Sequence, residues 1–172
     1  MRKDKLKRPI TNGVAKVPVI LQLEALECGA ASLAMVAAYY GKWVTLEKAR
    51  TDCGVSRDGS SAVNIVKAAR AYEFTVNKYK RNPESIRKKG VFPCIIHWNF
   101  DHFVVLNGFK GKYAYINDPA RGTVMIDEEE FDKAFTGITI NIVPSEDFHP
   151  EGKKENVLES AIKKLQMTGS AT

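Results

Sequence analysis

The pattern of apolar and polar positions changes near the middle of the chain. In the first half, apolar residues recur at helical spacing, in segments that begin after a capping residue or end at glycine. This pattern predicts helices at residues 28–40, 46–53, 62–72 and 84–89. The first of these is a dense run of Ala, Leu, Met and Val that closes at Gly41, which is typical of a buried helix.

From residue 74 onward, short runs rich in β-branched and aromatic residues dominate, separated by Gly and Asp-Pro turns. They predict strands at residues 74–80, 92–98, 102–109, 113–117, 123–126 and 138–143. One further helix, near residues 128–135, interrupts them. Helices followed by a series of strands are typical of an α+β fold, here with N-terminal helices packed on a C-terminal antiparallel β-sheet.

The positive charge of the chain is confined to its ends. The net charge is +6, and residues 1–16 alone hold six Lys or Arg against one Asp, whereas residues 17–150 hold 16 basic and 16 acidic residues. We therefore expect a basic flexible arm at 1–16, a folded domain at 17–147, and a linker with an amphipathic tail at 148–172. Because the folded part is neutral, no nucleic-acid partner is expected.

No segment of the sequence has the length and apolarity of a membrane span, since the longest near-apolar run, 30–40, has 11 residues where about 20 are needed. The polar linker and the amphipathic stretch 157–166 resemble the approach to a membrane region, which favours a domain excised from a longer protein. Neither a membrane domain nor a phosphate-binding GxxxxGK[ST] loop is present in these 172 residues.

The three cysteines are odd in number and widely spaced, and they include no CxxC pair. This argues against a disulfide framework and for a reducing compartment, and it predicts neither a metal site nor a cofactor. Cys28 stands where an irregular segment enters the apolar helix, so the positive end of the helix dipole favours its thiolate form. On its own, a cysteine in such a helix is more often a small buried apolar residue.

Three other residues gain meaning from their order relative to Cys28. His102 begins the most apolar predicted strand, Asp118 closes the next strand before a proline, and Gln22 lies six residues before Cys28. Each has an ordinary structural explanation alone, and His97 competes with His102 as the candidate base. Together the order Gln, Cys, His, Asp provides the oxyanion donor, nucleophile, general base and orienting acid of a papain-like cysteine hydrolase.

At three places the sequence resembles a known family. Gln22 is followed by five residues and then by Cys-Gly-Ala-Ala-Ser-Leu, and two further blocks read His-Trp-Asn-Phe-Asp-His-Phe-Val-Val-Leu from His97 and Asn-Asp-Pro-Ala around Asp118. In this order and spacing, the blocks resemble those of the bacteriocin-processing cysteine peptidases. These are the N-terminal domains of peptidase-containing ABC transporters, which cleave double-glycine leader peptides.

The resemblance implies the fold, the activity and the partners. It implies a papain-like cysteine endopeptidase that cuts after Gly-Gly or Gly-Ala in bacteriocin, lantibiotic or related precursors, with Cys28, His102, Asp118 and Gln22 in the four roles above. The leader would bind as an amphipathic helix, and the membrane and nucleotide-binding domains of one transporter would be partners at the cytoplasmic side of a bacterial membrane. Asp101 stands where the family has Asn before the histidine. We expect its carboxylate either to shift the protonation of His102 or to line the substrate groove.

Two other functions remain open at this stage. The first alternative is a leader-binding module without catalytic activity. The second is an acyltransferase or amidase that uses the same Cys-His-Asp triad. Activity that is lost in Cys28→Ala while binding is retained separates the peptidase from the binding module. A preference for an added amine over water as the acyl acceptor would support the acyltransferase.

Overall fold

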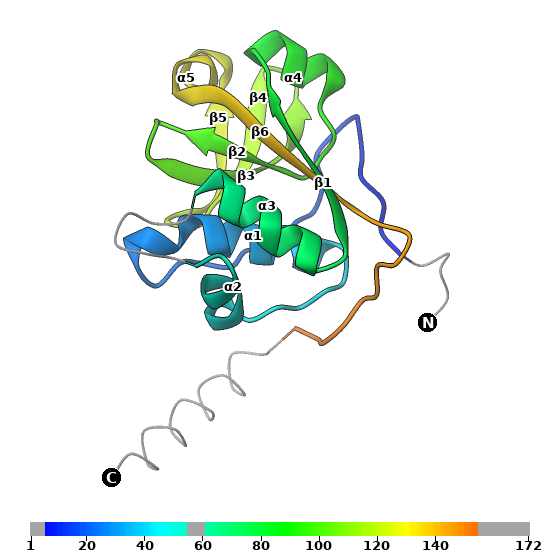
Figure 1. Cartoon of the computed structure of the whole chain (residues 1–172). Helices are drawn as coiled ribbons and strands as arrows, with labels where there is room; N and C mark the ends of the chain where they lie inside the picture. Colours follow the sequence, from blue (N-terminus) through cyan, green and yellow to red (C-terminus); the bar gives the residue numbers. More distant parts are fainter. Residues whose placement is uncertain (1–5, 55–60, 155–172) are drawn as a thin grey trace.

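The computed structural model describes residues 6–54 and 61–154, and their strands form one antiparallel sheet in the order β1-β6-β2-β3-β4-β5 (Figure 1). The strands are β1 Phe74–Lys80, β2 Cys94–Trp98, β3 His102–Lys110, β4 Tyr113–Asp118, β5 Gly122–Asp127 and β6 Phe135–Pro144. The helices are the 3-10 turn η2 Ala25–Glu27 and the α-helices α1 Cys28–Tyr39, α2 Leu46–Asp52, α3 Ala62–Ala71, α4 Pro83–Lys89 and α5 Glu128–Ala134. The predicted α+β class, with helices before an antiparallel sheet, is confirmed.

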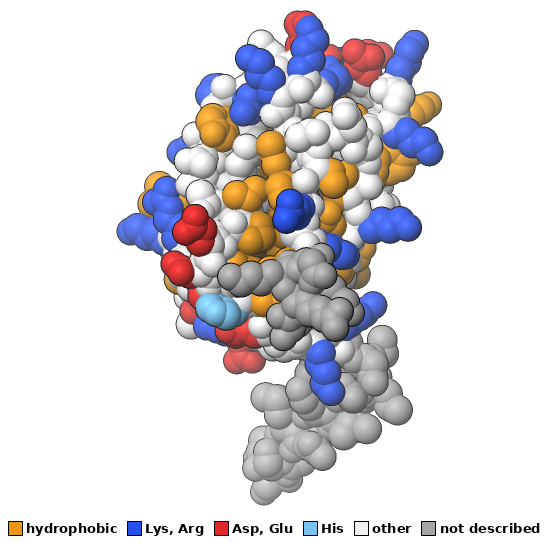
Figure 2. All heavy atoms as spheres, turned by 90° about the vertical axis from the view of Figure 1, so that its right-hand side faces the viewer, with side chains coloured by type: hydrophobic (Ala, Val, Ile, Leu, Met, Phe, Trp, Pro, Cys, Tyr) orange, Lys and Arg blue, Asp and Glu red, His pale blue; other side chains and the backbone are white. Residues whose placement is uncertain are grey.

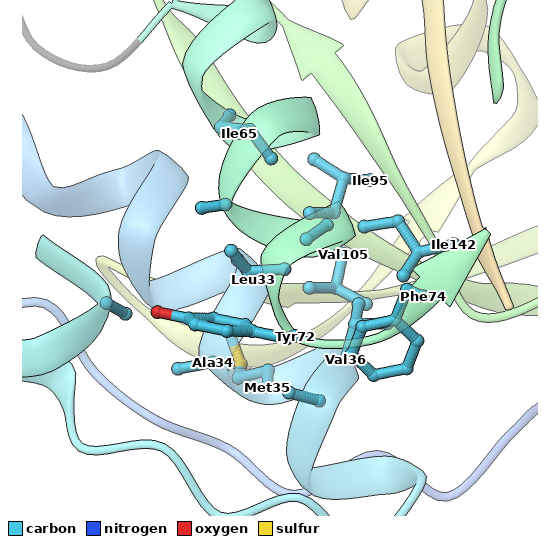
Figure 3. Packing of buried hydrophobic residues seen from close by; sticks show 14 of the residues in the cluster. Leu33, Ala34, Met35, Val36, Ile65, Tyr72, Phe74, Ile95, Val105 and Ile142 are labelled. Carbon is cyan, nitrogen blue, oxygen red and sulfur yellow. The ribbon is translucent and has the colours of Figure 1, made fainter. Parts of the chain in front are cut away.

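The sheet is covered by helices on both faces. Ile95 and Val105 point toward α1 and α3, and the neighbouring Ile96 and Val104 point into a second apolar cluster with α4 and α5. Because successive side chains of a strand face opposite sides, β2 and β3 are apolar at nearly every position. Figure 3 shows the first cluster, where side chains of α1 meet those of the α3 region and of the sheet.

Side chains cap the starts of four of the described α-helices. The side chains of Thr45, Ser61, Asn82 and Asp127 each accept a hydrogen bond from the backbone N–H three residues later, and thus cap α2, α3, α4 and α5. All residues of α1 are buried, as its composition predicts.

Two strand boundaries differ from the prediction by two residues or more, and the others agree to within one residue. Strand β6 begins at Phe135, three residues earlier than predicted, because Phe135 pairs with Trp98 directly after α5. Strand β2 begins only at Cys94, since Phe92 pairs instead with Ile10 of the N-terminal segment in an isolated bridge.

The N-terminal segment was expected to be a flexible arm, and within the described residues 6–16 that expectation is wrong. Ile10 forms a β-bridge with Phe92, Val14 forms one with Gly108, and the Ala15 N–H donates to the carbonyl of Asn107. The prediction rested on the concentration of positive charge in this segment, and charge does not indicate whether backbone groups form hydrogen bonds. The segment is therefore part of the folded unit.

The chain stays attached to the domain beyond the predicted boundary at residue 147. Phe148 is buried against Phe74, with the Lys42 ammonium 4.8 Å from its ring centroid. The backbone of Glu151 exchanges hydrogen bonds with that of Gly41 and Trp43. Packing thus continues to Glu151, and the amphipathic stretch 157–166 lies outside the described residues.

Charged side chains are distributed over the surface visible in Figure 2 rather than gathered on it. Lys and Arg side chains are spread around this face, with hydrophobic side chains between them. In the part of the chain that the structure describes, no helix is long and apolar enough to span a membrane.

Candidate active site

The nucleophile candidate lies at the start of a rigid, buried helix. Cys28 is the first residue of α1, its thiol is free, and only 8% of the residue is exposed. The Ser32 hydroxyl, one turn later, donates to the backbone carbonyl of Phe103 at 3.3 Å and so ties α1 to β3. The start of α1, where Cys28 lies, is thereby held beside the start of β3.

His102 is positioned by a tight hairpin between β2 and β3. The turn residues Asn99 and Phe100 both adopt positive φ angles, of 51° and 62°, and Trp98 pairs with His102 across it. The Nε2–H of His102 donates to Oδ1 of Asp118 at 2.8 Å. Burial alone would lower the pKa of His102, but hydrogen bonding to Cys28 and Asp118 outweighs it and raises this pKa to about 9.

Asp118 ends strand β4, the neighbour of β3 in the sheet, which is why residues 16 apart in sequence meet. Its Oδ1 also accepts the Ala120 N–H at 2.8 Å, and its Oδ2 accepts Nε of Arg121 at 3.1 Å. Burial would raise the pKa of Asp118, but bonds from His102, Ala120 and Arg121 lower it below its usual value. Asp118 is therefore a buried carboxylate, held in place from three sides.

The backbone of Gln22 is bonded to the turn that follows Asp118. Its N–H donates to the carbonyl of Pro119 at 2.8 Å, so the segment before α1 is bound beside Asp118. The side-chain oxygen Oε1 is buried and has no hydrogen-bond partner among the described residues. The position of the amide is thus set by the backbone around it, rather than by a side-chain hydrogen bond of its own.

Asp101 and His97, the two other candidates of the sequence, and the third histidine, His149, have different surroundings. Asp101 is exposed in the hairpin turn, and the bonds that raise the pKa of His102 come from Cys28 and Asp118 instead. The Nδ1 of His97 lies 3.1 Å from Thr136 Oγ1, and burial lowers the pKa of His97. His149 forms an ion pair with Glu73, 3.0 Å from Nδ1 to Oε2.

Two contacts of the site are not predicted by the sequence. One is Arg121 on Asp118, which has only a faint signal: a basic residue three positions after an Asp-Pro turn. The other is Glu27, whose buried carboxylate precedes Cys28 and pairs with Arg50 of α2 at 3.2 Å. The sequence marks Glu27 by its place next to the cysteine, but nothing in it indicates the partner.

A thiol, an imidazole and a carboxylate in line are suited to nucleophilic attack on a carbonyl carbon with proton transfer through the imidazole. In the described residues, no group of three or more His, Cys, Asp or Glu side chains is arranged to hold a metal ion. Together with helices packed on an antiparallel sheet, this arrangement is that of the papain-like cysteine peptidases. The model of the peptidase C39 family matches residues 16–147, and the chain belongs to this family of cysteine peptidases.

Curated relatives are much longer than this chain. The colicin V secretion/processing ATP-binding protein CvaB of Escherichia coli is 35% identical over 136 residues, which are 79% of this chain and 19% of CvaB. The lactococcin-G-processing and transport ATP-binding protein LagD of Lactococcus lactis subsp. lactis is 29% identical over 147 residues, 83% of this chain and 21% of LagD. The chain thus spans about a fifth of the length of these relatives.

Solved structures show the same fold. A double glycine motif protease from an AMS/PCAT transporter, crystallised with the leader peptide, is 66% identical, with a TM-score of 0.80 over 81% of this chain and 99% of that one. The peptidase domain of Streptococcus ComA, a bifunctional ABC transporter involved in quorum sensing, is 25% identical, with a TM-score of 0.70 over 76% and 99%.

Proposed function

We propose that this domain is a cysteine endopeptidase that removes double-glycine-type leaders, ending in Gly-Gly or Gly-Ala, from ribosomally made precursor peptides. The observation that supports this most is that His102 is hydrogen-bonded to both Cys28 and Asp118, in a member of the peptidase C39 family. The neighbour that was crystallised with a leader peptide, at 66% identity, supports the same substrate class.

In the proposed reaction, His102 and Cys28 act as one pair. The imidazole takes the thiol proton, and the thiolate sulfur attacks the carbonyl carbon of the second small residue. A C–S bond forms while the carbonyl π electrons move to oxygen. When the C–N bond breaks, His102 gives its proton to the leaving amine. Water then attacks the thioester and loses a proton to His102, which releases the leader acid and restores the thiol.

Asp118 and Gln22 act on the charges that develop during this reaction. The ionised Asp118 holds Nε2 of His102 and stabilises the imidazolium. Gln22 is bound beside Asp118 through Pro119, and its side-chain amide with the Cys28 N–H would hold the oxyanion. Asp101, in the exposed turn next to His102, would lie along the path of the substrate.

Large apolar side chains are exposed on the segment that leads to Cys28. Val19, Leu21 and Leu23 alternate along it and are 45%, 52% and 78% exposed, and Phe100 in the turn before His102 is 79% exposed. Exposed apolar groups around a polar site are typical of a peptide-binding surface. We assign them to the apolar face of an amphipathic leader helix.

The leader surface has a simple test. Leu23→Ser should raise the KM for a leader-bearing precursor at least several-fold and leave kcat nearly unchanged. Met125→Ser on β5 is the matched control, since this Met is 55% exposed but lies on the edge strand of the sheet. An equal rise of KM in both variants would reject this assignment.

The lengths and names of the curated relatives support a further partner. CvaB and LagD are secretion or transport ATP-binding proteins about five times as long as this match. We therefore propose that the domain works with the membrane and nucleotide-binding domains of such a transporter, at the cytoplasmic side of the membrane. Cleavage of the leader would then be coupled to export of the peptide.

Mass spectrometry of a precursor with a Gly-Gly leader tests the function itself. Wild type and Cys53→Ala, which removes a different buried thiol, should make a single cut after Gly-Gly, and Cys28→Ala should make none. Binding without cleavage by the wild type would replace the peptidase by a leader-binding module. Transfer of the leader to an added amine, in preference to water, would replace it by an acyltransferase.

A further inference from the structure

A buried carboxylate lies directly before the nucleophile, and the reaction described above does not use it. Glu27 ends η2, and its side chain is only 2% exposed. A charge is expensive to bury unless hydrogen bonds and an opposite charge compensate it. The groups that contact the Glu27 carboxylate therefore indicate its role.

Those contacts close a loop around the segment between Gln22 and Cys28. Oε2 accepts the backbone N–H of Leu23 at 2.9 Å and that of Glu24 at 3.3 Å, while Oε1 accepts Nη1 of Arg50 at 3.2 Å. Burial would raise the pKa of Glu27, but the bonds from Leu23, Arg50 and Glu24 lower it below its usual value. The group is thus an ionised acceptor of three hydrogen bonds.

The first of these N–H groups belongs to the residue immediately after Gln22. The Gln22 backbone is fixed on its other side by the 2.8 Å bond to the Pro119 carbonyl, next to Asp118. Because Oε1 of Gln22 has no partner among the described residues, the side-chain amide depends on this backbone for its position. Glu27 is the group that connects this backbone to the start of α1, where Cys28 lies.

We propose that Glu27, held by Arg50, is a positioning residue for the oxyanion site: it fixes the backbone after Gln22 so that the Gln22 amide lies beside the carbonyl attacked by Cys28. This rests on the proposed function only through the role of Gln22. The carboxylate itself touches neither the substrate nor the His102–Asp118 pair.

Glu27→Gln keeps the shape of the side chain but removes its charge and turns one acceptor oxygen into an NH₂ group. Since a misplacement of about 1 Å costs roughly 10²-fold in rate, we expect kcat to fall roughly 10–100-fold, which exceeds any rise in KM for the precursor that follows from a shift of Leu23. Arg50→Gln, at a side chain that is 52% exposed, should give a smaller loss in the same direction and guards against a folding defect in Glu27→Gln. Glu47→Gln, an exposed acid on the same helix as Arg50, is the control that should change nothing.

A double-mutant cycle separates positioning from a general structural role. Gln22→Ala alone should lower kcat roughly 10²–10³-fold, the usual loss for an oxyanion donor. If Glu27 acts through Gln22, then adding Glu27→Gln to Gln22→Ala should cost little more. Full additivity of the two losses in kcat would overturn the proposal.

Two chemical probes that need no leader complete the test. Alkylation of Cys28 by iodoacetamide passes through no oxyanion, so its rate should be unchanged in Glu27→Gln; a parallel fall would place the effect on the nucleophile and overturn the proposal. Acylation of Cys28 by p-nitrophenyl acetate does form an oxyanion, and it should slow roughly 10-fold or more. An unchanged acylation rate in Glu27→Gln would also overturn it. If wild type fails to cut the Gly-Gly precursor while this acylation still depends on Glu27, the proposed function fails and the positioning role stands.

Discussion

Nε2 of His102 donates to Oδ1 of Asp118 at 2.8 Å, which leaves Nδ1 as the ring nitrogen that serves Cys28. The carboxylate that sets this orientation is itself fixed by Ala120 and Arg121. Asp118, at the end of β4, and the two groups of the β4–β5 turn that hold it therefore determine the tautomer of His102.

Asp118→Asn should lower kcat roughly 10²-fold or more, because a neutral amide neither stabilises the imidazolium nor imposes one tautomer. Steady-state cleavage of the precursor measures this. The control is Asp132→Asn, which removes an acid that is paired with Arg87 on the far face of the sheet. If Asp118→Asn retained the wild-type kcat, then Asp118 would have no role in orienting His102.

Stability should depend on pH through His102. Its folded-state pKa, about 9, lies above the ordinary value of 6.5, so the folded state binds the proton more tightly than the unfolded chain. This contribution is fully present below pH 6.5 and is lost as the pH rises through about 9. The Tm of wild type should therefore fall across this window more steeply than that of His102→Gln, as followed by circular dichroism. Parallel falls in the two proteins would contradict the raised pKa.

Arg121→Gln should move the alkaline limb of the pH–rate profile upward. The guanidinium partly neutralises Asp118, so its removal strengthens the attraction of Asp118 for the imidazolium and raises the pKa of His102 further. Arg121→Lys should restore part of the wild-type profile, and Lys112→Gln, an exposed cation in the β3–β4 turn, should leave it unchanged. A downward shift of the alkaline limb in Arg121→Gln would refute this account of the charge balance.

Gly108→Ala should release the N-terminal segment. Gly108 has a φ of +142°, and a Cβ there would overlap the carbonyl oxygen of Gly13. Gly111→Ala is a matched control, since Gly111 also has a positive φ but nothing lies within 4 Å of the added carbon. We expect Gly108→Ala to lose about 1–3 kcal/mol more than Gly111→Ala in urea unfolding. Limited trypsin digestion should cut after the exposed Lys16 in Gly108→Ala alone, and equal protection of both variants would count against the close crossing.

Phe148→Ala should destabilise the domain by about 3–5 kcal/mol, because it empties a buried site between Phe74 and Lys42. Phe100→Ala is the control, since that ring is almost fully exposed and its loss leaves no cavity. Urea unfolding measures both. A chain that ends at residue 147 should lose at least as much as Phe148→Ala, because it lacks Phe148 and also the backbone bonds of Glu151. Full stability of that shorter chain would restore the domain boundary predicted at 147.

The sequence by itself determined the secondary structure and the identity of the candidate residues. Caps such as Thr45 and Asn82, the Ala-rich buried helix at 28–39 and the runs of β-branched and aromatic residues in the strands are local signals, which depend only on residues close together in sequence. The order of Gln22, Cys28, His102 and Asp118 belonged to three sequence blocks whose spacing is that of one family. The fold class followed from the same blocks and from helices preceding strands.

Only the tertiary structure decided how these parts meet. Three features of the site depend on side-chain directions that sequence patterns do not predict. They are the ring nitrogen of His102 that faces Asp118, the bond from Arg121 to Asp118, and the ion pair of Glu27 with Arg50. The attachment of residues 6–16 and of Phe148 depends on backbone bridges and on one aromatic ring, in stretches whose composition is that of loose tails. Most of these contacts join residues that are far apart in sequence, and the bond from Arg121 depends on the conformation of one turn. They therefore form only when the sheet has folded.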